Sequence, residues 1–409
     1  MSTWLLPRLD LTPEQLRVVE MTTSEHRVIL GPPGSGKTQV LIHRADHLSS
    51  TYRVPPDQYR VFVFTNVVKD YIQSAIQFLG LPEEVVSTFD HWCRLLYEAH
   101  VSERLPRKGA GINFGEIRSE VLKLLRRRSD LQKGLTFVLV DEGQDLPPQV
   151  YEILSLAAQH ITVFVDPQQR IFENGASESF ILDKLGSRMS NATLLGAYRN
   201  APYVAQLASY FINDEQKRGE YLAQINTEQK IREKPLCFVA SDFQKEMDRL
   251  AEIISQRQVM NERIGIIVPK NKELHGFANG LGRRGVTVEK AVPRGEDDGC
   301  DFGNGTPKIA TYFSAKGLTF DSVLLPRLTE SSFSWIGAST RLRLFFVGIA
   351  RATQWVYLSS IEGREFSEIK VIQDAESNGH LVLQHAHDSI QAGEKARNGA
   401  DMDDDFSVL

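Results

Sequence analysis

Among the features of this sequence, a glycine-rich loop at residues 31–36 places the strongest constraint on the fold. It lies between the apolar run RVIL (27–30) and the helix-like run TQVLIHRADHL, and its spacing, Gly31-x-x-x-x-Gly36-Lys37-Thr38, fits the P-loop pattern. Glycines allow backbone N–H groups to turn towards an anion, and the following helix directs the positive end of its dipole to the same place. The pattern therefore predicts a strand–loop–helix unit that binds the phosphates of a nucleotide.

The residues of this loop have different expected roles. We expect Lys37 to reach the outer phosphates and the Thr38 hydroxyl to hold a magnesium ion. The other predicted nucleotide contacts are the loop residues Gly31, Pro32, Pro33, Gly34, Ser35 and Gly36.

Short apolar runs alternate with helical stretches along most of the chain. The strand candidates are residues 27–30, 59–65, 135–142 and 161–166 in the first half, and 236–241, 263–269, 308–313, 321–328 and 355–360 in the second. Their near-continuous hydrophobicity is typical of parallel sheets that are covered on both faces. Because the chain has 409 residues, we predict two α/β domains of similar size, joined near residues 187–200.

Composition excludes several classes of protein. Three cysteines without paired spacing argue against a disulfide framework and a zinc site. We find no secretory signal pattern and no apolar run long enough to cross a membrane, so we expect a cytoplasmic protein without a membrane partner. The net charge of −5 means that any nucleic-acid surface must be a local patch. One basic segment, KLLRRRSDLQK (123–133), is either a solvated helix face or a phosphate-contacting surface.

A second motif, TFVLVDEGQD, supplies the carboxylates that a P-loop enzyme needs. Asp141 ends a buried strand, where it can ligate magnesium through water. Glu142 follows it and can accept a proton from an attacking water molecule. The two motifs together predict hydrolysis of a nucleoside triphosphate, with ATP and Mg²⁺ as the ligands.

The ordered set of motifs resembles superfamily 1 DNA helicases of the UvrD/Rep type from residue 9 to about residue 361. The resembling stretches are LTPEQLRVV, VFVFTNVVKDYI, VSTFDHWCRLL, DEGQD, VDPQQRIF, LGAYRNA, TYFSAKGLTFDSVLLP and RLFFVGIARAT. The resemblance implies two RecA-like P-loop domains with the ATP site in the cleft between them. It also implies nucleotide roles for Gln15 at the adenine edge, Gln144 as the link to the DNA groove, Gln169 as γ-phosphate sensor, Arg199 and Arg351 as γ-phosphate arginines, and Gly317 at the nucleotide.

The same resemblance implies a path for single-stranded DNA across both domains. The residues that it assigns to this path are Thr65, Asn66, Thr88 and Phe89 in the first domain and Thr311, Phe313 and Ser314 in the second. The motif that begins VDPQQ lacks the tryptophan that the family uses to stack on a base, so Phe89 and Phe313 are the aromatic residues best placed to stack instead. For Phe313, burial in the core is an equal alternative.

The chain also departs from the family in size. Only residues 93–136 are left for the accessory subdomain of the first half, and strands take up much of residues 200–310. We therefore expect a compact form with accessory subdomains reduced or missing. The expected division is a first domain at 1–190 with a small helical insertion at about 93–136, a second domain at 191–375, and a flexible acidic tail at 376–409.

Two functions remain open at this point. The first is an ATP-dependent motor on single-stranded DNA or DNA ends, moving 3′ to 5′ as the resemblance implies, with weak or partner-dependent unwinding. The second is a regulatory helicase-like ATPase that controls a partner protein, such as a nuclease in DNA repair or anti-phage defence. The complete nucleotide motifs fit both functions. The eroded DNA motifs and the missing subdomains favour the second, whereas the retained DNA-path residues favour the first, namely Thr65, Asn66, Thr88 and Phe89. We favour the motor of these two.

Overall fold

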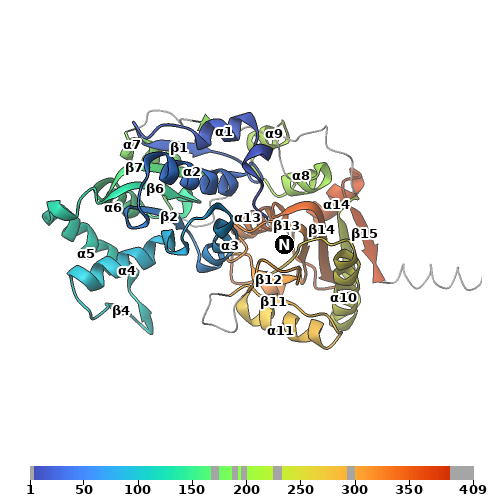
Figure 1. Cartoon of the computed structure of the whole chain (residues 1–409). Coiled ribbons are helices and arrows are strands. Elements are labelled where there is room, and N and C mark those ends of the chain that lie inside the picture. The colour runs from blue at the N-terminus through green and yellow to red at the C-terminus, as the bar shows by residue number, and fades with distance from the viewer. Residues whose placement is uncertain are drawn as a thin grey trace, which may run out of the picture.

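The computed structural model describes residues 4–166, 175–186, 192–194, 200–223, 233–292 and 300–386. In these residues the strands form two sheets, both parallel throughout, and one short antiparallel hairpin. Figure 1 shows the two sheets in separate lobes, the first in blue and green and the second in yellow and red. The predicted α/β architecture with parallel sheets is confirmed.

The first lobe is built on a sheet that has six strands in its described residues, in the order β3-β2-β6-β7-β1-β8. These strands are β1 (Arg27–Leu30), β2 (Tyr59–Val63), β3 (Val86–Thr88), β6 (Leu135–Val140), β7 (Ala158–Val165) and β8 (Ala192–Thr193). Helices cover both faces because neighbouring residues point to opposite sides of a strand. Ile29, for example, packs with α1 (Pro13–Val19), α2 (Lys37–Tyr52) and α3 (Asn66–Ile76), whereas Val28 packs with α4 (Phe89–His100), α5 (Phe114–Arg127), α6 (Pro148–Ala157) and α7 (Glu178–Lys184).

The second lobe contains a sheet with seven strands in its described residues, in the order β11-β12-β10-β13-β14-β9-β15. These are β9 (Leu236–Ala240), β10 (Ile264–Val268), β11 (Glu289–Lys290), β12 (Lys308–Thr311), β13 (Phe320–Leu325), β14 (Ala352–Ile361) and β15 (Val382–His385). Helices α10 (Phe243–Val259) and α11 (Asn271–Gly282) cover one face. The remaining helices of this lobe are α8 (Pro202–Ser209), α9 (Glu215–Ala223), α12 (Glu330–Phe333), α13 (Ala338–Ile349) and α14 (Ile369–Ser377).

The two lobes are in contact. Buried residues of α2 and α3 belong to the same apolar cluster as buried residues of α8 and α13, so the core is continuous between the lobes. This contact places the loop that follows β12 beside α3, where a Cβ on Gly317 would lie 3.0 Å from Cγ2 of Val68. The carboxyl ends of the first lobe's strands therefore face the second lobe, which positions the site described below.

Residues 93–136 contain most of α4, a hairpin of β4 (Arg107–Lys108) and β5 (Gly111–Ile112), and α5. In Figure 1 this group projects from the first lobe, away from the second. Three basic side chains of the segment 123–133 form exposed ion pairs, namely Lys123 with Glu120, Arg126 with Glu152 and Arg128 with Asp130. This pairing supports the interpretation of that segment as a solvated helix face.

The end of the described chain differs from the sequence-based expectation. Strand β15 pairs in parallel with β9 and lies inside the segment for which we expected a flexible tail, so that prediction is wrong for residues 382–385. The four residues of β15 are too few for their sequence pattern to predict a strand, because this strand is stabilised by its pairing with β9 at the edge of the sheet. Strand β8 likewise pairs with β1, two residues beyond the expected domain boundary. Among the described residues, no helix combines the length and apolar character that a membrane span requires.

Candidate nucleotide site and nucleic-acid groove

The P-loop connects the end of β1 to the start of α2, and its backbone explains its glycines. Gly34 and Gly36 have φ angles of 77° and 84°, a left-handed conformation that is strained for other residues. A Cβ on Gly31 would lie 2.5 Å from Oγ of Ser35, so that position also needs glycine. The loop consequently curls tightly in front of the first turn of α2.

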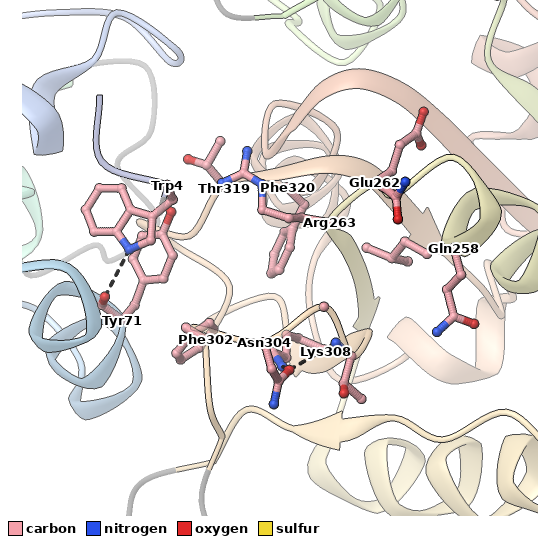
Figure 2. A pocket seen from close by; sticks show the side chains of 14 residues that line it. Trp4, Tyr71, Gln258, Glu262, Arg263, Phe302, Asn304, Lys308, Thr319 and Phe320 are labelled. Carbon is pink, nitrogen blue, oxygen red and sulfur yellow. Dashed lines mark hydrogen bonds between the residues drawn. The ribbon is translucent and has the colours of Figure 1, made fainter. Parts of the chain in front are cut away.

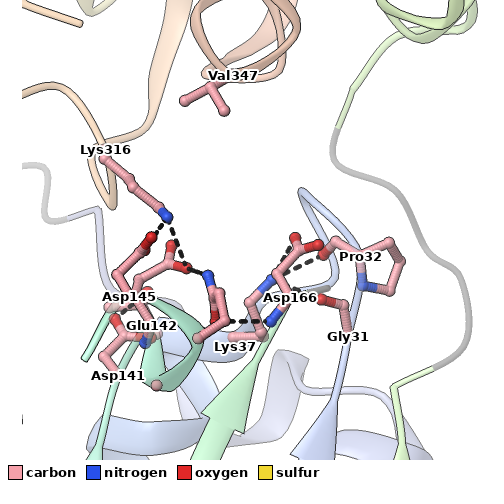
Figure 3. Close-up of polar contacts among 12 residues, drawn as sticks. Gly31, Pro32, Lys37, Asp141, Glu142, Asp145, Asp166, Lys316 and Val347 are labelled. Carbon is pink, nitrogen blue, oxygen red and sulfur yellow. Dashed lines mark hydrogen bonds and ion pairs between the residues drawn. The ribbon is translucent and has the colours of Figure 1, made fainter. Parts of the chain in front are cut away.

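Lys37 lies at the centre of this loop. Its Nζ donates to the carbonyls of Gly31 (2.7 Å) and Pro32 (3.0 Å) and to Oδ2 of Asp166 (3.0 Å), as Figure 3 shows. Oγ of Ser35 is buried and has no hydrogen-bond partner among the described residues. An inward-turned loop with a buried lysine and an unsatisfied hydroxyl fits an anionic ligand such as a phosphate chain.

A pair of carboxylates follows β6, as the sequence predicted from its position in the chain. Oγ1 of Thr38 donates to Oδ2 of Asp141 at 3.1 Å. Burial and the charge of the neighbouring Glu142 raise the pKa of Asp141 to about 6. The described residues contain no cluster of three or more His, Cys, Asp and Glu suited to a metal ion. Thr38 and Asp141 nevertheless fit Mg²⁺, which is usually bound by one or two protein oxygens and otherwise by water and phosphate.

Glu142 is held in an uncommon conformation, with φ 51° in the left-handed region. Nε2 of Gln144 donates to its carboxylate, and Oε1 of the same amide accepts from the N–H of Asp166 at 2.9 Å. Burial alone would raise the pKa of Glu142. The cations around it, first Lys316 and then Lys37 and Arg351, outweigh burial and lower this pKa. The lowered pKa favours the ionised form of the Glu142 carboxylate.

The second lobe contributes side chains to the same place. Nζ of the buried Lys316 forms ion pairs with Asp145 and, at 3.7 Å, with Oε2 of Glu142 (Figure 3). Arg351, which precedes β14, is also buried and donates Nε to the Val347 carbonyl at 3.2 Å. The cleft between the lobes is lined by residues from both, among them Gly34, Gly36, Lys37, Thr38 and Glu142 from the first and Gly317 and Arg351 from the second. The structure thus brings together residues that are more than 300 positions apart in the chain.

Gln15 lies next to the P-loop, but its amide is engaged with the protein. Its Oε1 accepts from the N–H of Thr12 at 3.0 Å and completes a capping box at the start of α1. Its Nε2 donates to the carbonyl of Ser35 at 3.0 Å. These contacts support the loop, and the expected contact with an adenine edge stays a prediction.

A groove of about 480 Å³ in the first lobe gathers all four residues of that lobe that we expected on the DNA path. It is lined by Thr65, Asn66, Thr88 and Phe89, together with His91, Arg94, Phe114 and Arg118. The hydroxyls of Thr65 and Thr88 cap α3 and α4 by accepting from backbone N–H groups at 3.1 Å and 3.2 Å. Two helix N-termini therefore open into this groove, and their dipoles favour phosphate groups.

Base stacking by Phe89, in contrast, is not possible in this arrangement. Its side chain is only 2% exposed, and its ring packs edge-on against Phe62 with centroids 5.4 Å apart. The prediction that Phe89 stacks on bases is therefore wrong, because the first turn of α4 directs this ring into the core. In the second lobe Phe313 is half-buried against Trp335, and Oγ1 of Thr311 accepts from the N–H of Ser314 at 3.2 Å. These three residues of the second lobe do not line the 480 Å³ groove.

The comparison with protein families gives a match over the first lobe. The family model described as the UvrD/REP helicase N-terminal domain matches residues 11–105 and 96–189, the part that holds the P-loop and both carboxylates. The chain therefore resembles the UvrD/REP helicases over residues 11–189, a little under half of its length. Its two parallel sheets are accordingly those of two RecA-like domains, as the motif order implied.

The curated relatives of this chain are distant in sequence. It is 22% identical over 344 residues to the "Putative ATP-dependent DNA helicase YjcD" of Bacillus subtilis (strain 168), a match that covers 63% of this chain and 45% of the relative. It is 24% identical over 278 residues to the "Probable DNA helicase" of Mycoplasma pneumoniae (strain ATCC 29342 / M129 / Subtype 1), with 62% of this chain and 50% of the relative covered. The chain thus spans about half the length of the curated relatives that it matches.

One solved structure is similar in part. The crystal structure of the C-terminal domain of a possible DNA helicase from Lactobacillus plantarum WCFS1 matches with a TM-score of 0.35 and 15% identity. The match covers 46% of this chain and 99% of that domain. A similarity this low carries no argument about function.

Two expected site residues, Gln169 and Arg199, lie outside the described residues. Two residues of the site were missed by sequence reasoning. Asp166 ends the strand candidate 161–166 and pairs with Lys37, so a carboxylate at a strand end was the signal that could have revealed it. Lys316 directly precedes Gly317, but nothing in the sequence indicates that it crosses to the other lobe.

Proposed function

We propose that this chain hydrolyses ATP and uses the hydrolysis to move along single-stranded DNA, in the 3′ to 5′ direction. The proposal rests on one observation, that residues of both lobes line the cleft. Lys316, Gly317 and Arg351 of the second lobe meet the P-loop and carboxylates of the first. A nucleotide held there contacts both lobes, so its hydrolysis changes how they fit together.

Each side chain has a chemical role in this proposal. Lys37 exchanges its contacts with backbone carbonyls for the β- and γ-phosphates and neutralises their charge. Thr38 and Asp141 hold Mg²⁺, which when bound neutralises charge on the phosphate oxygens. Glu142, ionised in its cationic surroundings, orients the attacking water and accepts its proton.

Arg351 acts on the transition state. Charge spreads over the γ-phosphoryl oxygens as the bond to the leaving group breaks, and a guanidinium group stabilises that charge. Burial lowers the pKa of Arg351, although the carboxylates of Glu142, Asp166 and Asp141 oppose this effect. The charge of Arg351 acts in a site from which water is largely excluded, where electrostatic stabilisation is strongest.

Coupling between the catalytic base and the fit of the two lobes follows from the connections of Gln144 and Asp145. Its amide joins the Glu142 carboxylate to the N–H of Asp166, so the position of the catalytic base depends on the ends of two neighbouring strands. Asp145 belongs to the same short turn and is paired with Lys316 of the second lobe. A change in the fit of the lobes therefore reaches Glu142 through one hydrogen-bond network.

The groove at α3 and α4 supports single-stranded DNA as the track. Its two helix N-termini suit a phosphate backbone. Arg118 pairs with Asp90 of the same groove at 2.6 Å and Arg94 with Glu98 at 3.8 Å, so we propose that phosphates compete with these carboxylates for the two arginines. Because the ring of Phe89 is not available to stack on a base, contacts with the DNA backbone dominate. We therefore propose that the chain binds DNA with little sequence preference, and that its unwinding of duplex DNA is weak or depends on a partner.

The burial of Phe89 also favours a second candidate, a regulatory ATPase that controls a partner protein such as a nuclease. The same cleft would then open and close against a protein instead of DNA. The two candidates differ in what stimulates hydrolysis, which is DNA for the motor and the partner for the regulator.

The nucleotide part of the proposal is tested by measuring ATP binding and hydrolysis separately. We expect Lys37→Ala to weaken both, and Glu142→Gln to bind ATP while hydrolysis stops. The exposed Lys245→Ala serves as the control for loss of a lysine. A Glu142→Gln protein that turns over ATP at the wild-type rate would overturn the assignment of the base.

A further inference from the structure

Arg44 is a completely buried cation in α2, about two turns after the P-loop lysine. Burial and the nearby Arg27 lower its pKa to about 10, so the side chain keeps its charge at neutral pH. Within the described ranges it pairs with no carboxylate. Its Nε donates to Oγ1 of Thr162 at 3.0 Å, and its Nη2 lies 3.2 Å from Nε2 of His160. Because burying a charge without a counter-charge is costly, its remaining N–H groups need other partners.

Those partners are carbonyl groups at the end of α1. Nη1 of Arg44 donates to the carbonyl oxygens of Val18 at 3.0 Å, Val19 at 3.1 Å and Met21 at 2.7 Å. Val18 and Val19 are the last residues of α1, and Met21 lies two positions beyond it. The carbonyls at the end of a helix lack partners within the helix and carry the negative end of its dipole. Arg44 therefore ties the C-terminus of α1 to α2.

The other end of α1 holds the P-loop. Gln15 completes the capping box at the start of α1, and its Nε2 donates to the carbonyl of Ser35 at 3.0 Å. The peptide group between Ser35 and Gly36 is trans, so its C=O and its N–H point in opposite directions. The bond from Gln15 therefore directs the N–H of Gly36 away from α1 and towards the cleft, which Gly36 lines. N–H groups at the start of a helix that are directed in this way bind phosphate.

Helix α1 is thus fixed at both of its ends to one continuous piece of chain, the P-loop and α2. Arg44 holds the C-terminus of α1 against α2, and Gln15 holds its N-terminus against the loop. The seven residues of α1 span only about 10 Å, so a tilt that is released at one end changes hydrogen-bond distances at the other. Loss of the arginine contacts therefore reaches the peptide group that Gln15 orients.

The segment before α1 is anchored to α2 separately. Nε2 of Gln39 donates to the Trp4 carbonyl at 2.7 Å, and Oε1 of the same amide accepts from the N–H of Leu6 at 2.9 Å. Nε2 of the buried His43 donates to the Leu6 carbonyl at 2.8 Å. Figure 2 shows Trp4 at the edge of a cavity of about 260 Å³ that is lined mainly by the second lobe. Removal of the arginine should therefore loosen α1 and leave the segment of Trp4 in place.

We propose that Arg44 is a positioning residue of the phosphate site, which acts through α1 and Gln15 on the peptide group between Ser35 and Gly36. The N–H of Gly36 binds phosphate well only while that peptide group keeps its orientation. A purely structural role of Arg44 would lower the stability of the chain without changing the phosphate affinity of the folded protein. The inference rests on the proposed nucleotide function and adds to it a residue that prepares the loop for its ligand.

The test measures the binding of inorganic tripolyphosphate and of ATP to the full chain, each with Mg²⁺, by titration calorimetry. Tripolyphosphate reports on the loop alone because it has no base. We expect Gln15→Ala and Arg44→Met each to raise the Kd of both ligands by about 10- to 150-fold, the range for one hydrogen bond to a charged group. The double variant should bind no more weakly than Gln15→Ala alone, because Arg44 acts through Gln15.

Three further variants complete the design. His43→Leu removes another buried polar side chain of α2, one that bonds to the segment of Trp4 and not to α1, so it should lower the melting temperature and leave both Kd values unchanged. Arg17→Met removes an exposed arginine of α1 and should change neither. Arg44→Lys keeps a cation that can donate to the same carbonyls and should lose part of the affinity, which tests the proposal even where Arg44→Met does not fold.

The outcomes separate this role from the phosphate site itself. Unchanged affinity in the folded Arg44 variants, an equal loss in His43→Leu, or additive losses in the double variant would overturn the positioning role while the phosphate site stands. A wild type that binds neither ligand would overturn the proposed function and this inference with it.

Discussion

Replacing Arg351 by alanine is expected to slow ATP hydrolysis far more than it weakens ATP binding. The side chain is 7% exposed and lies in the cleft with Lys37, Thr38 and Glu142. A charge about 4 Å from the transferred phosphoryl group, at an effective dielectric constant of about 20, contributes about 4 kcal/mol. If that interaction forms only in the transition state, its loss corresponds to a factor of about 10³ in kcat, the lower end of the range for such arginines.

The fold should tolerate this change. Arg351 donates Nε to the Val347 carbonyl at 3.2 Å and Nη1 to the Leu318 carbonyl at 3.4 Å, both at the long end for hydrogen bonds. Their loss should lower the free energy of unfolding by about 1 kcal/mol. Arg364→Ala, at an exposed position in the turn after β14, is the control for removal of an arginine.

The assay is steady-state hydrolysis over a range of ATP concentrations, with the Kd of ATP measured independently. We expect kcat to fall by about 10³ while the Kd changes by less than about tenfold. A variant that shows the reverse, with normal kcat and a raised Kd, would refute the role of Arg351 in the transition state.

Three further predictions concern other parts of the molecule. Lys316→Met should lower the free energy of unfolding by about 3–5 kcal/mol in urea, because it leaves the buried Asp145 without its cation, and an unchanged midpoint would contradict this pairing. Burial and the neighbouring Arg44 lower the pKa of His160 to about 3, so the unfolded chain binds the extra proton first and stability falls as the pH drops below about 6.5. The loss due to His160 should be about 2 kcal/mol at pH 5, and melting curves in which His160→Gln keeps the full pH dependence would disprove it. Arg94→Ala should reduce the slope of log Kd against log salt for single-stranded DNA by about 0.7. An unchanged slope would show that Arg94 does not contact the DNA phosphates.

The nucleotide half of the site was largely predictable because its parts are contiguous in the sequence. The P-loop supplies its own glycines, lysine and threonine within eight residues, and a carboxylate pair follows the strand at 135–140 as expected. The strand at 27–30 was predicted to its last residue, since a buried apolar run bounded by glycine leaves little choice.

The features that the sequence did not reveal depend on packing between distant segments. Lys316 pairs with Asp145, 171 positions away, and only the contact between the lobes brings them together. The motif around Phe89 predicts a ring that is free to stack on a base, but the start of α4 directs this ring against Phe62. Pairing at a sheet edge likewise creates β15 from a segment without a strong pattern of its own.

The central claim, that hydrolysis is coupled to single-stranded DNA, is tested most directly by measuring the ATPase rate across a titration of oligo-dT. The measurement is made at two salt concentrations, on the wild type and on Glu142→Gln as the inactive control. We predict that oligo-dT stimulates the wild-type rate at low salt and that higher salt shifts the half-saturating concentration upwards, because backbone contacts dominate the groove. An ATPase rate that does not change with oligo-dT at low salt would contradict the motor and leave the regulatory ATPase as the function of this chain.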